Sequence, residues 1–106
     1  MDVDPGEVFE DVVEELSPRG VTAGRMFGAR SMMLNGKAVA CLTHGMLAVK
    51  LGRDEPEHAA ALALEGAEVW EPGGQGKPFH DWVALPPEQV DEWSRLAGAA
   101  VDWASR

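Results

Sequence analysis

The sequence predicts an α+β fold, a two-layer α/β sandwich in which helices cover one face of an antiparallel sheet. Three observations indicate this class. Apolar residues recur with helical spacing near both ends of the chain, strand-like segments in the middle are joined by turn dipeptides, and an alanine-rich helical segment separates two groups of strands. The expected order is α-β-β-β-α-β-β-α. No linker divides the 106 residues, so residues 1–106 should form one domain.

The first element is a helix that begins after Asp4. Asp4 can cap the helix, Pro5 suits its first turn, and Glu7 has the spacing of a capping box. One apolar stripe follows, made of Val8, Phe9, Val12, Val13 and Leu16. Ser17-Pro18 should end the helix, because proline cannot continue its hydrogen bonds.

Three strands are expected to follow as a meander. Asn35-Gly36 is a strong hairpin signal, because a type I′ turn needs positive φ at both central residues. It would join a strand at residues 30–34 to a strand at residues 37–42. His44-Gly45 is a weaker turn signal that leads into a third strand at residues 46–51.

Side-chain alternation assigns the residues of this meander to two faces. The face expected to meet the helices carries no charge and comprises Ser31, Met33, Ala38, Ala40, Leu42, Leu47, Val49 and Leu51. The opposite face mixes apolar and basic side chains: Arg30, Met32, Leu34, Lys37, Val39, Cys41, Met46, Ala48 and Lys50. It would stay open unless a loop, a helix end, another chain or a ligand covers it. A one-residue slip at the His44 turn would reverse the faces of the third strand.

The second half of the chain supplies two helices and two strands. Residues 52–54 turn into the alanine-rich helix, which should end at Gly66. A short strand at residues 67–72, a glycine-rich loop at residues 73–78 and a strand at residues 80–85 come next. Pro86-Pro87 opens the last helix, whose apolar stripe is Val90, Trp93, Ala97, Ala100, Val101 and Ala104.

Charge is unevenly distributed along the chain. The protein has 18 Asp plus Glu against 9 Lys plus Arg, a net charge of −9, yet residues 21–53 contain no acid and carry +5. An acidic protein repels nucleic acid and anionic membranes, so neither partner is expected. No apolar run is long enough to span a membrane, and the acidic N-terminus does not resemble a secretion signal. We therefore expect a cytoplasmic protein.

No residue pattern predicts a catalytic residue, a metal site or a cofactor. His44, His58 and His80 lack the spacing of metal ligands. Cys41 is the single cysteine and lies in an apolar strand, which favours a structural role, although Arg30 or Lys50 on its face could lower its pKa. The loop at residues 73–78 resembles a phosphate-binding loop only in its glycines and lysine, since it opens no helix.

Several motifs resemble the N-terminal domain of the TfoX/Sxy competence-regulator family. They are Gly24-Arg25-Met26-Phe27-Gly28, Leu34-Asn35-Gly36-Lys37, Val69-Trp70-Glu71-Pro72, Gly76-Lys77-Pro78 and His80-Asp81-Trp82-Val83. The resemblance covers residues 7–104 and implies an α/β sandwich like that of secretion chaperones, together with a regulatory role in a bacterial protein. The glycine and aromatic residue that often follow Met-Phe-Gly in the family are replaced by Ala29, Arg30 and Ser31. The family has no established catalytic residues to carry over.

Two functional hypotheses follow. The leading one is a non-enzymatic domain that binds a protein partner, or a second copy of itself, through the open sheet face; its contact residues would be Arg30, Met32, Leu34, Lys37, Val39, Met46 and Lys50. The alternative is a site for a small anionic ligand, or an enzyme site, near Arg25, Arg30 and Lys77. Nucleic-acid binding through the basic block ranks last.

Overall fold

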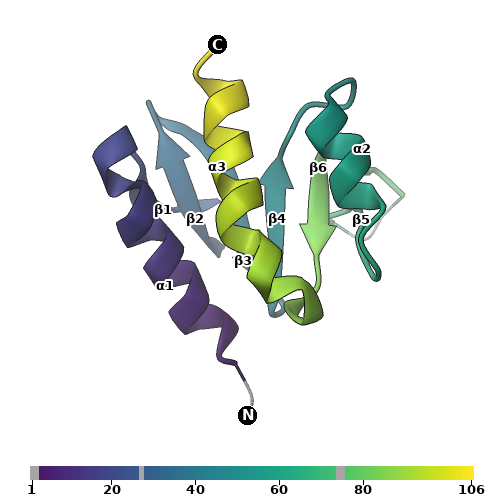
Figure 1. The fold of residues 1–106 in the computed structure, drawn as a ribbon, viewed down its shortest axis with the longest axis horizontal. Helices are drawn as coiled ribbons and strands as arrows, with labels where there is room; N and C mark the ends of the chain where they lie inside the picture. The colour runs from purple at the N-terminus through teal and green to yellow at the C-terminus, as the bar shows by residue number, and fades with distance from the viewer. Residues whose placement is uncertain (1–2, 27, 74–75) are drawn as a thin grey trace.

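The structure, a computed structural model, describes residues 3–26, 28–73 and 76–106. It has two layers, three α-helices on one side of a six-stranded sheet, and confirms the predicted fold class (Figure 1). The elements in chain order are α1 (Pro5–Leu16), β1 (Thr22–Met26), β2 (Ala29–Leu34), β3 (Lys37–Thr43), β4 (Met46–Lys50), α2 (Pro56–Leu62), β5 (Glu68–Trp70), β6 (Phe79–Leu85) and α3 (Trp93–Ala104). Short 3-10 turns follow α1 and precede α3.

The sheet has the order β1-β2-β3-β4-β6-β5, and every neighbouring pair is antiparallel. Strands β1 and β5 are therefore its two edges. Helix α3 lies across β3 and β4 and contacts α1 and α2 on either side of it, while α2 packs on β6. All three helices lie on the same side of the sheet (Figure 1).

Strand β1 was not predicted. The first predicted strand is at residues 30–34, whereas residues 22–26 form a strand before it, so the observed order is α-β-β-β-β-α-β-β-α. The segment contains Gly24 and Arg25 and is mostly exposed. Its strand conformation comes from backbone pairing with β2, which runs from Thr22↔Met33 to Met26↔Ala29. A pattern of apolar residues does not predict such backbone pairing.

The first helix has its predicted bounds, whereas the end of α2 and the start of α3 differ from the prediction. Asp4 caps α1 as predicted, and its carboxylate accepts a hydrogen bond of 2.9 Å from the Gly6 backbone nitrogen. Helix α2 ends at Leu62, before Gly66, which nevertheless has the left-handed φ of +83° expected of a helix-terminating glycine. The last α-helix begins only at Trp93, because residues 87–92 form a 3-10 turn.

Both predicted hairpin turns are confirmed. Asn35 and Gly36 have φ of 53° and 80°, and His44 and Gly45 have φ of 51° and 76°. Positive φ at both central residues is the signature of the type I′ turn, whose twist matches that of the flanking strands.

A β-bulge at Val39 overturns part of the predicted face assignment. Met33 pairs with Ala38, whereas the next residue of β2, Met32, pairs with Ala40, so Val39 has no partner. One extra residue reverses the facing of every residue on one side of it. The whole of β2 and the start of β3 therefore face opposite to the prediction, while the β3–β4 pairing beyond the bulge has the predicted register.

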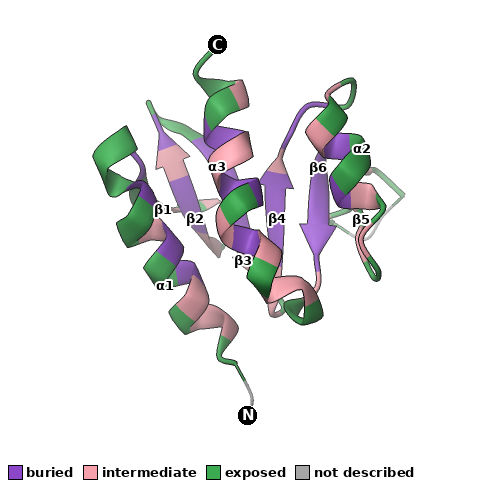
Figure 2. Ribbon diagram, viewed as in Figure 1, coloured by how far each residue is buried: buried purple, intermediate pink, exposed green. Residues whose placement is uncertain are grey.

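The main core lies between the sheet and the helices. Met32, Leu34 and Val39, predicted on the open face, belong to this core together with Leu47, Val49, Leu51 and the inward residues of α1 and α3. Trp93 of α3 is fully buried there. Figure 2 shows buried stripes on the sheet-facing sides of α1 and α3, and strands β4 and β6 buried over most of their length.

Candidate functional site: the open sheet face

The sheet face opposite the helices carries a second apolar cluster, here called the open face. Small buried residues form its floor: Ala38, Cys41, Ala48 and Ala84. Six larger residues stand on and around them: Met26, Met33, Met46, Trp70, Phe79 and Trp82. All three helices lie on the other side of the sheet, so no described helix covers these side chains (Figure 1).

Aromatic rings occupy the end of the open face over β5 and β6. The Trp70 and Trp82 rings are tilted with centroids 5.0 Å apart, and the Phe79 ring meets Trp70 edge-on at 5.8 Å. Both tryptophans are 5% exposed, whereas Phe79 is half-buried. The cluster forms a rigid aromatic corner, because edge-on and tilted aromatic pairs stabilise one another beyond simple burial.

Three half-buried methionines occupy the remainder of the open face. Met33 of β2 lies over Gly24 of the neighbouring strand, so closely that a Cβ on Gly24 would lie 2.5 Å from the Met33 Cγ. Met26 ends β1 and Met46 begins β4. Because methionine is flexible and polarizable, it adapts to the shape of whatever packs against it.

The open face is nearly uncharged. Strand pairing also places four uncharged residues on this side: Thr22, Gly24, Ser31 and Thr43. The charged residues that pairing places there are Lys50, opposite Trp82, and Glu68, opposite Ala84. In a protein with a net charge of −9, a neutral apolar face is where another acidic molecule meets the least electrostatic repulsion.

Cys41 lies on the open face, as predicted, but is not poised to react. It is fully buried, and its Sγ lies 3.2 Å from the Ser31 Oγ. Burial raises the pKa of the Cys41 thiol, an effect that outweighs the hydrogen bond with Ser31. Arg30 offers no activation, because it lies on the helix side of the sheet. A protonated, buried thiol has a structural role.

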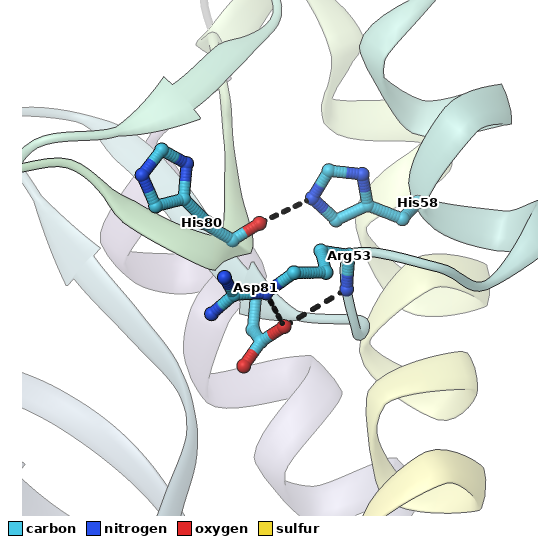
Figure 3. A network of polar contacts seen from close by, with 4 residues as sticks. All are labelled: Arg53, His58, His80 and Asp81. Atoms are coloured by element: carbon cyan, nitrogen blue, oxygen red, sulfur yellow. Dashed lines mark hydrogen bonds and ion pairs between the residues drawn. The ribbon is translucent and has the colours of Figure 1, made fainter.

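A polar network closes one end of the face, where β4 turns toward α2 (Figure 3). The Asp81 carbonyl accepts hydrogen bonds from the Leu51 and Gly52 backbone nitrogens at 2.8 and 3.0 Å. Its carboxylate accepts two more from Arg53, one from the backbone nitrogen at 2.9 Å and one from Nε at 3.0 Å. His58 Nε2 donates to the His80 carbonyl oxygen at 2.8 Å. These bonds hold the turn against the start of β6.

The Arg53–Asp81 ion pair also shifts both groups. Hydrogen bonding to Arg53 holds the pKa of the Asp81 carboxyl below its ordinary value, and the nearby Lys50 acts in the same direction. The same pair raises the pKa of Arg53. Both side chains therefore stay ionised at neutral pH.

The basic residues predicted for the open face are dispersed. Arg30 forms an ion pair with Glu10 of α1, and its guanidinium lies 5.4 Å from the Phe9 ring centroid, so it belongs to the helix side. Lys37 is exposed at the hairpin, on the side of its partner Leu34. Lys50 ends β4, with its Nζ 5.8 Å from the Trp103 ring centroid. Of the predicted contact residues, Met46 and Lys50 have positions on this face.

The alternative ligand site near Arg25, Arg30 and Lys77 is not assembled. Arg25 and Arg30 are paired across β1 and β2, and Arg25 donates to the Gly28 carbonyl oxygen at 3.4 Å. Lys77 is exposed just before β6, four strand positions from β1 in the sheet. At about 4.8 Å per strand the separation is roughly 19 Å, too far for one small ligand.

The motif residues with a structural description have packing or turn roles. Gly24 allows the close approach of Met33, Met26 packs on the open face, and Gly28 and Gly76 have positive φ of 73° and 71°. Phe27, the aromatic residue of the first motif, lies outside the described residues. The residues that sequence reasoning missed are Met33, Phe79 and the two tryptophans; two tryptophans on adjacent predicted strands were the available signal.

The described residues hold neither a metal-binding cluster nor a membrane-spanning helix. Within residues 3–26, 28–73 and 76–106, no three His, Cys, Asp or Glu side chains gather where they could hold a metal ion. No helix in this part of the chain is long and apolar enough to cross a membrane. Comparison with known proteins found no matching family model and no matching curated protein.

Proposed function

We propose that this domain is a non-enzymatic interaction module that binds a second copy of itself through the open face. The observation that carries the proposal is the layer of half-buried, uncharged Met26, Met33, Met46 and Phe79 on a sheet face that no helix covers. Apolar patches of this kind on small domains mark contact surfaces. The motif resemblance to the TfoX/Sxy family supports placing the module in a bacterial cytoplasmic regulator.

Charge favours a second copy as the occupant. Acidic side chains line the exposed side of α1, including Glu7, Glu10, Asp11, Glu14 and Glu15. Two copies that met through their helices would bring like charges together, whereas the charged residues that strand pairing places on two open faces are Lys50 and Glu68 of each copy. The neutral face is thus the surface through which two copies of an acidic chain approach at least cost.

The area of the face is sufficient for a specific dimer. Six strands spaced about 4.8 Å apart and about five residues long give a surface of roughly 29 by 17 Å, or about 500 Å² per copy. Two such surfaces bury about 1,000 Å², the lower end of the range for specific interfaces. We expect a dissociation constant in the micromolar range, with the half-buried methionines and Phe79 contributing most of the affinity.

Analytical ultracentrifugation of wild type, Met46→Glu and Val3→Glu tests the proposal. Met46→Glu places an unpaired carboxylate in the interface, so its dissociation constant should rise at least about tenfold. Val3 is 54% exposed and precedes α1, so Val3→Glu adds the same charge away from the interface and should dimerise like wild type. Circular dichroism checks that each variant is folded.

Two results would overturn self-association through this face. One is a wild-type protein that remains monomeric at about 100 μM, far above the expected dissociation constant. The other is a folded Met46→Glu variant that dimerises as tightly as Val3→Glu. Met33→Glu is a second interface variant, and dimerisation by both would place the contact elsewhere on the molecule.

A further inference from the structure

A hollow of about 310 Å³ lies where β4 ends and β6 begins, next to the aromatic corner of the open face. Its lining combines two cations, Lys50 and Arg53, with His80, Asp81 and three less polar residues: Pro78, Phe79 and Trp82. We propose that this hollow binds a small organic anion, a carboxylate attached to a flat apolar body. Nothing in the self-association of the domain requires such a site.

Arg53 is oriented for this purpose by Asp81. The Asp81 carboxylate accepts hydrogen bonds from the Arg53 backbone nitrogen and from its Nε, which fixes the plane of the guanidinium (Figure 3). Within the described part of the chain, no hydrogen bond engages the two terminal guanidinium nitrogens. Their N–H groups are the fork that pairs with a carboxylate through two parallel hydrogen bonds.

Lys50 supplies the second positive charge. It lies opposite Trp82 in the β4–β6 pairing, its Nζ lies 5.8 Å from the Trp103 ring centroid of α3, and no ion pair to it is found among the described residues. Its charge acts on Asp81, since it helps to lower the pKa of that carboxyl. With Lys50 and Arg53 against the single carboxylate of Asp81, the hollow carries a positive charge in a protein whose net charge is −9. Opposite charge concentrates anions locally.

The walls select an organic anion over an inorganic one. Half-buried Pro78 and Phe79 and the nearly buried Trp82 line the hollow, and a bare phosphate would leave their apolar surface against water. A flat unsaturated body packs against aromatic rings while its carboxylate reaches the cations. The volume is at the lower end of small-molecule sites, which limits the body to about one ring.

An NMR titration of the ¹⁵N-labelled protein with benzoate tests the site. Benzoate should shift the amide signals of Arg53 and Trp82 with a millimolar dissociation constant, whereas benzamide, its neutral analogue, and inorganic phosphate should bind at least about tenfold more weakly. Lys50→Gln should weaken benzoate binding about tenfold. Lys37→Gln, which removes the same charge from the exposed hairpin, should bind benzoate like wild type.

Four outcomes would overturn the proposal. Benzoate at about 50 mM, well above a millimolar dissociation constant, could leave the Arg53 and Trp82 signals unmoved. Benzamide could bind as tightly as benzoate, which would show that charge does not drive binding. Phosphate could do so, which would show that the apolar walls do not contribute. Lys50→Gln could bind no differently from Lys37→Gln. Because the hollow shares Lys50 and Phe79 with the open face, the titration is repeated in the Met46→Glu background, where self-association is weakened. Ultracentrifugation of the same samples reports self-association separately, so failure of one proposal is distinguishable from failure of the other.

Discussion

Among single residues, Asp81 does the most to shape the end of the open face. Its carbonyl and carboxylate together accept four hydrogen bonds from residues 51–53, so the start of β6 and the turn after β4 form one unit. The position of Arg53 depends on this one side chain. Sequence reasoning noted Asp81 only as part of a motif, because partners 28 residues apart leave no local pattern.

Replacing Asp81 should make the stability of the protein less sensitive to acid. We expect Asp81→Asn to lower Tm by roughly 3–6 °C at pH 7. Because the folded pKa of Asp81 lies below its ordinary value of about 3.9, its contribution is fully present above that value and is lost as pH falls through the folded pKa. The difference in Tm should be constant from pH 8 to about pH 5 and close below about pH 4.

Calorimetry across this pH range, with Asp91→Asn as the control, measures the effect. Asp91 is exposed, and no ion pair to it is found among the described residues, so Asp91→Asn changes the net charge equally without removing a contact. If Asp81→Asn lowered Tm as much at pH 3 as at pH 7, the ionised carboxylate would not be the group that stabilises the turn.

Among the elements, the β2–β3 hairpin has the largest consequence for function. Its Asn35-Gly36 turn has the predicted conformation, yet the bulge at Val39 turns Met32 and Leu34 into the core and Met33 outward. A bulge cannot be predicted from a run of apolar residues, because hydrophobic side chains are buried whichever set of alternate residues faces the helices. Packing determines which residues face the helices: Met33 packs over Gly24, and Met32 packs beneath the helices.

A pair of glutamate substitutions tests this register. Val39 is 1% exposed in the core, so Val39→Glu should destabilise the fold by more than about 3 kcal/mol, because it buries an unpaired carboxylate. Met33→Glu lies on the open face and should cost less than about 1.5 kcal/mol. Urea denaturation measures both values. The predicted register without a bulge would give the reverse order, with Met33→Glu the more damaging variant.

In the whole molecule, the segregation of charge decides how copies can meet. The acidic side chains lie mainly on the helical layer and its turns, whereas the open face carries Lys50 and Glu68. A dimer of two −9 chains therefore brings long-range repulsion together with local apolar attraction.

Salt should strengthen this dimer. Raising NaCl from about 0.05 to 0.5 M shortens the screening length to a few ångströms and removes most of the repulsion between copies. We expect the dissociation constant to fall about three- to tenfold, as measured by sedimentation equilibrium. An interface made of ion pairs would respond in the opposite direction, so weaker dimerisation at high salt would argue against the apolar face.

The amino-acid pattern alone was sufficient for the fold class, the capped first helix, the positions of both hairpin turns and the placement of Cys41 and Met46 on the open face. These features depend on residues that are close in sequence, so local conformational preferences and periodicity are enough to predict them. Strand β1, the Val39 bulge and the Asp81 network required the folded molecule, because each depends on partners far apart in sequence. The local pattern predicted that an open face exists. Long-range packing determined its residues, which include Met33, Phe79 and two tryptophans and exclude Met32, Leu34 and Val39.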